Sequence, residues 1–389
     1  MPAKQKRILT SLYLIVALFA SPVVYSLNLD PISADHWDEN HAAHLASRAG
    51  FGLLPVEIAA LAAEEPIKAV AYFVDGAAKP NVSAFEHSGI FDEGLDPFPP
   101  SRPATTRLAK EQGHVLGINV KPGGNRPIQP IVNKFFYWLR ASRLETDRVS
   151  YWWANRMLTT NHPLQEKMAL FWHGHFATNE DKVRDYRKML KQLELFQEKG
   201  LSNFRELLIA VSQDPAMLAF LDAGVNTKDS PNENFAREIM ELFTMGVGHY
   251  SETDVQEAAR AFTGWNSRNL VFYIDEEQHD SGVKRFLGKE DNFSGTDIID
   301  LILEQPVTAE FIAAKIYRYF VSDQLSESDV KELGALLRDQ DFDISEFMRT
   351  LFLSEDFYSD KNRGTHIKSP VELVISTYKK LGMNQVPGI

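Results

Sequence analysis

The sequence predicts a mainly α, multi-helical globular domain with long irregular loops and at most a small β element. Apolar residues recur at helical spacing in several long segments, and Ser or Thr residues followed three positions later by Asp or Glu mark helix starts. The best strand candidate covers only residues 270–274. A chain of 389 residues with 44% hydrophobic and 24% charged residues has the composition of a folded protein.

The first segment, residues 1–26, reads as a secretory signal peptide. Three basic residues precede an apolar run over residues 8–20, and small or polar residues follow as far as Ser26. The run is shorter than the roughly 20 residues that span a bilayer, which favours a cleaved signal over an uncleaved anchor. We therefore expect a periplasmic or secreted mature protein with no stable membrane insertion.

Residues 27–75 form the next predicted unit, a small helical module. Gly50-Phe51-Gly52 should end one helix, and Pro55 should open a second amphipathic stretch. Residues 76–128 carry many Pro and Gly residues without clear periodicity, so they predict a long irregular connection. Loops of this length are usually functional or flexible, and this one is expected to wrap the core or lie over a site.

Residues 129–389 are predicted to form the main helical domain. Leu164, Met168 and Phe171 mark the buried stripe of a helix over residues 163–173. Two capping boxes predict further helices, with more helices from about residue 308. The boxes are Thr178 with Asp181, for a helix that ends near Gly200, and Ser230 with Glu233, for a helix that has Pro231 at its first position and stops at Gly246.

Charge and cysteine content exclude several functions. A formal net charge of −12 argues against a nucleic-acid partner, because binding to phosphates needs clustered Lys and Arg. The chain has no Cys, which excludes disulfides, thiolate metal ligands and a cysteine nucleophile. Any chemistry must use His, carboxylates, hydroxyls or Lys.

Several motifs occur in a fixed order along the chain: His44-Leu45, Arg48-Ala49-Gly50-Phe51-Gly52, Glu166-Lys167-Met168, Phe171-Trp172-His173-Gly174-His175-Phe176, Pro231-Asn232-Glu233-Asn234-Phe235-Ala236-Arg237-Glu238, Glu241-Leu242-Phe243-Thr244, Ala259-Arg260-Ala261-Phe262-Thr263-Gly264-Trp265, His279-Asp280 and Lys368-Ser369-Pro370-Val371-Glu372-Leu373. On these motifs the chain resembles the bacterial family catalogued as domain of unknown function 1800. The resemblance implies an exported, largely helical protein of Gram-negative or related bacteria, often encoded beside a sulfatase-like partner protein, and it implies no reaction. Such proteins typically continue past the Lys-Ser-Pro motif, so we expect a C-terminally truncated member with apolar surface uncovered beside residues 368–380.

His173 and His175 are the first candidate metal ligands. Residues two apart on a helix point about 200° apart, so both could bind one metal ion only if the helix ends near Gly174. The alternative is that His175 is a satisfied core histidine and that His173 caps the helix end.

Glu238 and Glu241 share one stripe of the predicted helix with Asn234, opposite an apolar side. Glu257 on the next helix could complete a metal site with these carboxylates, as helical bundles do. A solvated acidic face, or pairing of Arg237 with Glu233 or Glu241, is the alternative.

His279, Asp280 and Lys284 lie in a Gly-containing loop. An Asp-oriented His could act as a general base, and Lys284 could bind an anionic substrate, whereas Asp280 could equally cap a turn.

Two functional hypotheses follow. The first is an envelope enzyme that uses a divalent metal ion and catalyses a hydrolysis, with His173, His175, Glu238, Glu241, Glu257 and His279 in its site. The second is a noncatalytic, polysaccharide-associated envelope protein that works with a partner and whose buried polar residues form structural networks. The expected substrate is a polysaccharide or another envelope component.

Overall fold

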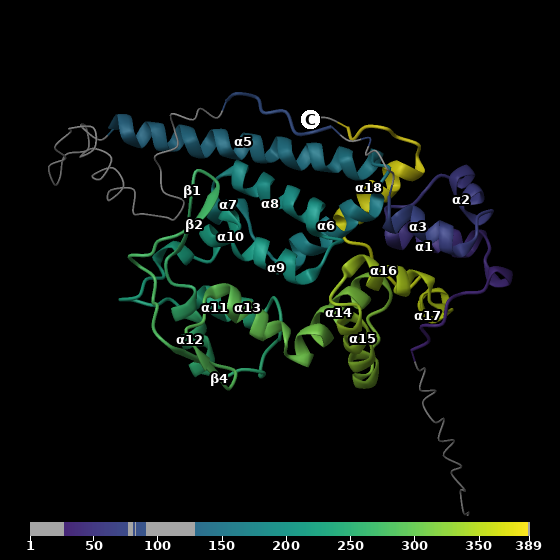
Figure 1. The fold of residues 1–389 in the computed structure, drawn as a ribbon. Coiled ribbons are helices and arrows are strands. Elements are labelled where there is room, and N and C mark those ends of the chain that lie inside the picture. The colour runs from purple at the N-terminus through teal and green to yellow at the C-terminus, as the bar shows by residue number, and fades with distance from the viewer. Residues whose placement is uncertain (1–26, 77–80, 82, 91–128, 388–389) are drawn as a thin grey trace, which may run out of the picture.

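The computed structural model describes residues 27–76, 81, 83–90 and 129–387 (Figure 1). The predicted signal peptide and most of the predicted 76–128 connection lie outside the described residues. The described part is mainly α, as predicted, and contains two small two-stranded sheets. None of its helices has both the length and the apolar character needed to cross a membrane.

The N-terminal part folds as three helices, and prolines and glycines set their limits. Gly50 follows α1 and Gly52 has a φ of 92°, so the predicted stop is confirmed. Pro66 divides the second predicted stretch into two helices. The elements are η1 (Ala34–His36), α1 (Glu39–Ala49), α2 (Pro55–Ala62) and α3 (Pro66–Val74).

The middle of the chain supplies the longest helix and the centre of the molecule. Figure 1 shows α5 running along one side, with α6 and α8 beside it. The elements are α5 (Gln129–Thr159), α6 (Pro163–His175), α7 (Glu180–Val183), α8 (Tyr186–Lys199), α9 (Phe204–Ser212) and α10 (Pro215–Phe220).

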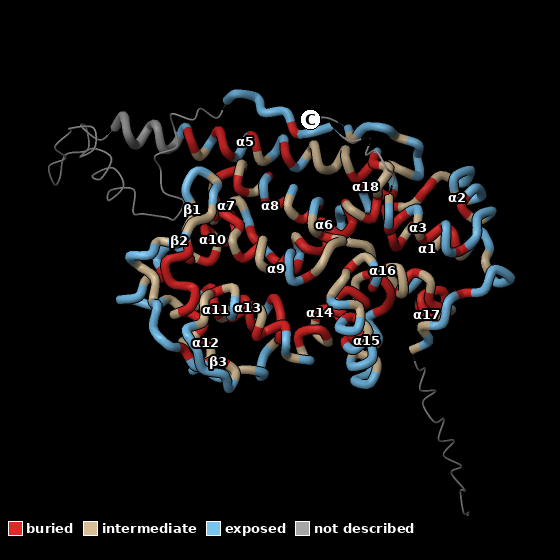
Figure 2. Tube along the Cα trace, in the orientation of Figure 1, coloured by how far each residue is buried: buried red, intermediate tan, exposed pale blue. Residues whose placement is uncertain are grey.

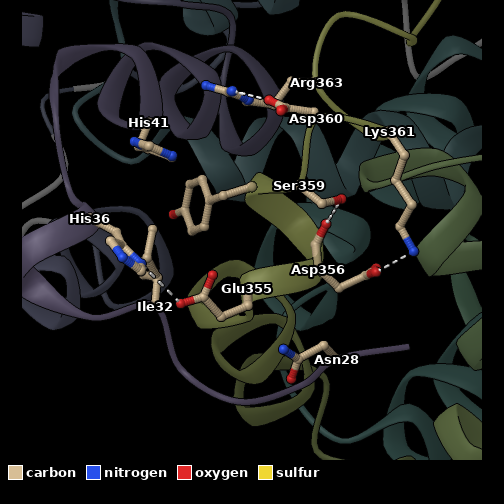
Figure 3. A pocket seen from close by; sticks show the side chains of 11 residues that line it. Asn28, Ile32, His36, His41, Glu355, Asp356, Ser359, Asp360, Lys361 and Arg363 are labelled. Carbon is tan, nitrogen blue, oxygen red and sulfur yellow. Dashed lines mark hydrogen bonds and ion pairs between the residues drawn. The ribbon is translucent and has the colours of Figure 1, made fainter. Parts of the chain in front are cut away.

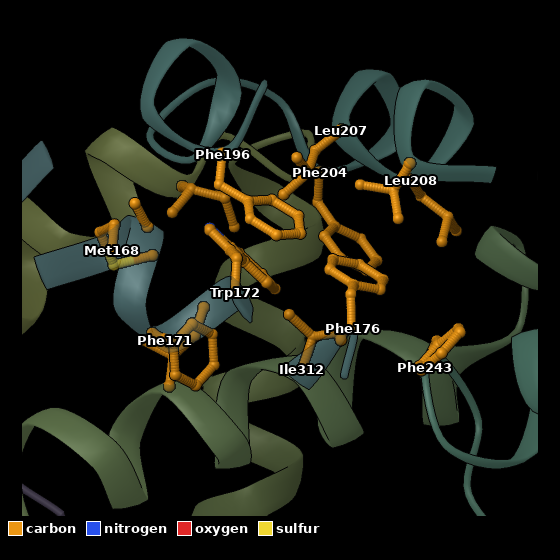
Figure 4. Packing of buried hydrophobic residues seen from close by; sticks show 14 of the residues in the cluster. Met168, Phe171, Trp172, Phe176, Phe196, Phe204, Leu207, Leu208, Phe243 and Ile312 are labelled. Atoms are coloured by element: carbon orange, nitrogen blue, oxygen red, sulfur yellow. The ribbon is translucent and has the colours of Figure 1, made fainter. Parts of the chain in front are cut away.

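The core around α6 is aromatic (Figure 4). Trp172 stacks on Phe176 and on Phe204, with ring centroids 5.6 Å apart in both pairs. Its indole Nε1 donates to the backbone oxygen of Gly200 at 2.8 Å, so the one polar atom of this buried ring is satisfied. Burial of so many large rings accounts for much of the stabilising apolar area.

The same helix also buries two charges. Glu166 is fully buried and accepts hydrogen bonds from Trp153 Nε1, Arg156 Nε and Gln197 Nε2 at 2.8–2.9 Å. Lys167 is 3% exposed, and its ammonium pairs with Glu372 and donates to the backbone oxygen of Gly50 at 3.1 Å. These contacts tie α6 to α5, to α8, to the end of α1 and to α18 (Pro370–Lys380).

A mixed segment follows, and the strand prediction there is confirmed. β2 pairs antiparallel with β1, with Trp265 opposite Ile274, and β3 pairs with β4, with Lys284 opposite Asp291. The elements are η4 (Ala223–Val225), α11 (Asn234–Glu241), α12 (Glu252–Ala261), β1 (Trp265–Arg268), β2 (Val271–Ile274), β3 (Lys284–Phe286) and β4 (Lys289–Asp291).

Two predicted helix starts are wrong. Ser230 forms a β-bridge with Thr227, and α11 begins only at Asn234. Thr178 is buried and donates to Gln192, while Asn179 and Asp185 cap α7 and α8. The Thr178 hydroxyl is bonded to Gln192 instead of capping a helix, and the β-bridge to Thr227 keeps Ser230 outside α11. The local sequence pattern reveals neither partner.

The C-terminal part returns to helices earlier than predicted, at residue 295. A capping box of Ser294 and Asp297 starts the first of them, and a Cβ atom at Gly334 would lie 2.6 Å from Glu310, so α14 and α15 pack unusually closely. Leu373, Val374 and Leu381, on and just after α18, are 56%, 45% and 70% exposed, and the expected truncation stays a prediction. The remaining elements are α13 (Gly295–Leu303), α14 (Pro306–Phe320), α15 (Glu327–Asp339), α16 (Ile344–Leu353) and α17 (Glu355–Tyr358).

Backbone hydrogen bonds join the N-terminal segment to the turn between α16 and α17. Ile32 N donates to Leu353 O at 2.7 Å, and Glu355 N donates to Asp30 O at 2.8 Å. The Arg48 guanidinium donates to the backbone oxygens of Tyr319 and Phe320 at 2.7 Å, at the end of α14. Figure 2 shows the buried stretches of these helices meeting in the interior.

We predict that the Lys167–Glu372 pair is required for stability. Glu372→Gln leaves a buried ammonium without its carboxylate, which typically costs ~3–5 kcal/mol in the free energy of unfolding. Urea denaturation measures the loss. The exposed pair of Glu327 and Lys331 is the matched control, and Glu327→Gln should cost less than about 1 kcal/mol. Equal effects of the two substitutions would contradict the prediction.

A second prediction concerns Asp214, which caps α10. Burial raises the pKa of Asp214 to about 7, although Met217 N, Ala216 N and Gln192 Nε2 donate to its Oδ1. A carboxyl whose pKa is higher in the folded state than in the unfolded state stabilises at low pH, and this contribution is lost as the pH rises toward 7. Asp214→Asn keeps the cap without titrating, so its stability relative to the wild type should increase between pH 3.8 and about 7. If the difference in the free energy of unfolding between this variant and the wild type stayed constant across this pH range, the raised pKa of Asp214 would be contradicted.

Candidate functional site

A cavity of about 500 Å³ lies between α6, α14 and the segment that leads into α18. Its wall includes His175 from α6, Lys315, Arg318 and Tyr319 from α14, and His366 and Glu372 from the C-terminal part. A cavity of this size with few polar groups on partly apolar walls is typical of small-molecule sites. Of the residues singled out in the sequence as candidate ligands or catalysts, only His175 lines it.

Lys315 and His175 form the centre of this site. Lys315 Nζ lies 3.2 Å from His175 Nδ1, donates to Leu242 O at 3.2 Å and sits 4.5 Å from the centroid of the Phe311 ring. Burial lowers the pKa of His175 to about 3, and the charge of Lys315 adds to this effect. The imidazole is therefore neutral, with Nδ1 accepting from Lys315 and Nε2 donating to Phe243 O at 3.1 Å.

The lining of the cavity carries two cations, Lys315 and Arg318, and two carboxylates, Asp323 and Glu372. No described carboxylate lies within ion-pair distance of Lys315 or Arg318. Lys167 and Arg48 add two cations behind the wall, and the carboxylates at the site are those of Glu372 and Asp323. Burial opposes ionisation of Glu372, but the His366 hydrogen bond and the charge of Lys167 outweigh it and hold the pKa of this carboxyl well below its usual range.

Tyr319 borders the same cavity, but its hydroxyl is inaccessible to solvent. Its oxygen is buried and has no hydrogen-bond partner among the described residues. Burial raises the pKa of Tyr319 well above its usual range, so the hydroxyl stays protonated and can donate.

The predicted pair of His173 and His175 does not meet. α6 continues through His175, so the helix end that a shared metal site needs near Gly174 is absent. The His173 ring packs 5.7 Å from Trp153, and His175 is the satisfied core histidine of the alternative interpretation. Among the residues that the structure describes, no three His, Asp or Glu side chains are grouped to hold a metal ion.

The acidic stripe of α11 has its own partners. Glu241 accepts from the Tyr250 hydroxyl at 2.9 Å, and burial and the neighbouring Glu241 raise the pKa of Glu238. Arg237 pairs with Glu233 at 3.0 Å, as the alternative interpretation expected, and with Glu252 at 2.7 Å. Neither ring nitrogen of His175 contacts Glu238 or Glu241, because both already have other partners.

The remaining predicted residues do come together, around Arg260. Its guanidinium pairs with Glu257 at 2.9 Å and with Asp280 at 2.8 Å. Lys284 is fully buried and donates to the backbone oxygen of Asp280 at 2.6 Å, and His279 Nδ1 lies 2.8 Å from the backbone oxygen of Thr263. These groups mainly satisfy one another, which is how a structural polar network behaves.

A second cavity, of about 670 Å³, lies between the N-terminal segment and the turn after α17 (Figure 3). Sequence reasoning did not single out its residues. His41 Nδ1 lies 2.6 Å from Asp38 Oδ1, His36 Nδ1 lies 3.6 Å from Glu355 Oε1, and Lys361 pairs with Asp356 at 2.7 Å. Its charged groups are thus paired with one another, unlike Lys315.

A family model described as "Protein of unknown function (DUF1800)" matches residues 44–388. The chain belongs to the DUF1800 family. The match includes every residue named at the cavity of Lys315. Comparison with curated proteins and with solved structures gives no match.

In this DUF1800 protein, the sequence did not predict three residues that line the cavity: Lys315, Arg318 and Tyr319. They stand three and four positions apart on α14, so they share one side of that helix. A lysine within the largely apolar stretch 306–320 was the available signal, but no motif distinguishes it from a solvated lysine.

We predict that His175 stays neutral until the pH approaches about 3, with hydrogen on Nε2. Nitrogen-15 NMR of the ring nitrogens in the folded protein measures both properties. Lys315→Met should raise the pKa, because it removes the neighbouring positive charge. Protonation of the wild-type ring near its ordinary pKa of 6.5 would contradict the assignment.

Proposed function

We propose that this protein is an exported bacterial envelope protein that binds a small anionic ligand in the cavity of Lys315. The observation that carries the proposal is the environment of the Lys315 ammonium. It contacts an imidazole, a backbone oxygen and an aromatic ring, and no described carboxylate lies within ion-pair distance of it. Lys315 is half-buried, and a cation that has lost part of its solvation is stabilised by a nearby anion. A ligand carboxylate, sulfate or phosphate would supply that anion.

The walls of the cavity define the rest of the ligand. Phe171 and Tyr319 offer aromatic surface, whereas Arg318 can bind an oxoanion through two parallel hydrogen bonds. An acidic sugar or another small organic anion combines these properties. Such a ligand fits the expectation of a polysaccharide or another envelope component as substrate.

Export rests on residues 1–26, and the sulfatase-like partner rests on the family resemblance. The His and Glu residues predicted for a metal-dependent hydrolase have other partners in the described structure. The anion-binding site is therefore the function that the geometry supports best.

The test is binding of inorganic phosphate, sulfate and glucuronate to the purified protein by isothermal titration calorimetry. Lys315→Met and Arg318→Gln should each weaken binding at least tenfold, which corresponds to the loss of about 1.4 kcal/mol or more. The affinity should also fall with added salt, because the attraction is electrostatic. Lys331→Gln, on the exposed face of α15, is the control and should bind like the wild type. Unchanged affinity in both cavity variants would refute the proposal.

A further inference from the structure

The surroundings of Lys315 point beyond binding. We propose that Lys315 forms an imine with the carbonyl group of a ligand that also carries a carboxylate, such as a 2-oxo acid. The proposal rests on the anion-binding cavity proposed above and names the class of its ligand.

The first argument is the set of partners around the Lys315 nitrogen. His175 Nδ1 and Leu242 O, each 3.2 Å away, can accept hydrogen bonds without neutralising the charge, and the Phe311 ring covers another side. Burial lowers the pKa of Lys315, because no described anion offsets the lost solvation. Lysines in such surroundings provide the free amine that attacks carbonyl carbons.

Two buried lysines, Lys167 and Lys284, lack this combination. Lys167 pairs with Glu372. Lys284 is enclosed by Asp280 O and Asn292 Oδ1, and burial lowers its pKa although the carboxylates of Asp280 and Glu257 oppose this effect. Lys315 alone of these three lines a cavity that a ligand can enter.

The second argument is what stands beside Lys315 on the same side of α14. Arg318 lies one turn on and can bind the ligand carboxylate. Tyr319 also borders the cavity, but its hydroxyl is buried. Lys315 and Arg318 therefore supply the amine and the carboxylate binder that a 2-oxo acid needs.

The reaction balances without any further reagent. The nitrogen of Lys315 adds to the carbonyl carbon while one ammonium proton passes to the carbonyl oxygen, which gives a carbinolamine. The carbon–oxygen bond then breaks, and the hydroxyl group leaves as water with a second proton from nitrogen. Ammonium and carbonyl thus become a protonated imine and water, with no change of oxidation state. His175 Nδ1 and Leu242 O, each 3.2 Å from Lys315 Nζ, orient the nitrogen for this attack.

The experiment is reductive trapping in the full-length purified protein. Pyruvate and borohydride should modify Lys315 in preference to exposed lysines, with saturation at rising pyruvate concentration, as located by peptide mass spectrometry. Lys315→Arg keeps the charge but cannot form an imine. It should lose this label completely.

Arg318→Gln separates carboxylate recognition from amine reactivity. It should lower labelling by subsaturating pyruvate at least tenfold and leave labelling by acetaldehyde, which has no carboxylate, unchanged. Lys331→Arg is the control and should be labelled at Lys315 like the wild type. Circular dichroism confirms that each variant is folded.

Two results would overturn the inference. In the first, the protein binds phosphate but the label is spread over exposed lysines and is absent from Lys315. This result would refute imine formation and leave the proposed function unchanged. Failure of the wild type to bind phosphate, sulfate, glucuronate or pyruvate removes both.

Discussion

The burial of α6 is the constraint on which the rest of this structure depends. Two successive residues of this helix, Glu166 and Lys167, are charged and inaccessible to solvent, so each needs partners from elsewhere. Those partners come from α5, α8, the end of α1 and α18, which fixes four elements around one helix. The aromatic side of the same helix, centred on Trp172, then defines the core.

This arrangement explains why one cavity differs from the other polar clusters. Around Arg260 and around Asp356, charges of opposite sign meet and cancel. At the cavity, Glu372 pairs with Lys167 of α6, and no described carboxylate lies within ion-pair distance of Lys315. Lys315 is instead held by an imidazole, a backbone oxygen and an aromatic ring.

The sequence predicted those features that local pattern determines. Pro163 and a regular apolar stripe placed α6 within two residues of its observed end, and the strand at residues 271–274 follows from its β-branched and aromatic residues. The start of α11 was misplaced because Asn232 N bonds to the side chain of Asn226, six residues back. Most of the candidate site was not predicted. Lys315 is distinctive because no described carboxylate pairs with it in the folded structure, and the spacing of residues along the sequence does not predict which charges lie apart in three dimensions.

The backbone bonds between residues 30–32 and 353–355 have a consequence for the order of folding. α1 is held through Arg48 by the end of α14, so an N-terminal helix depends on residues about 270 positions later. Contacts so distant along the chain slow folding, because the loop must close before they contribute. The N-terminal helices therefore cannot reach their final packing before residues 319–355 have been made. Until then their apolar faces stay exposed as the chain emerges from the ribosome.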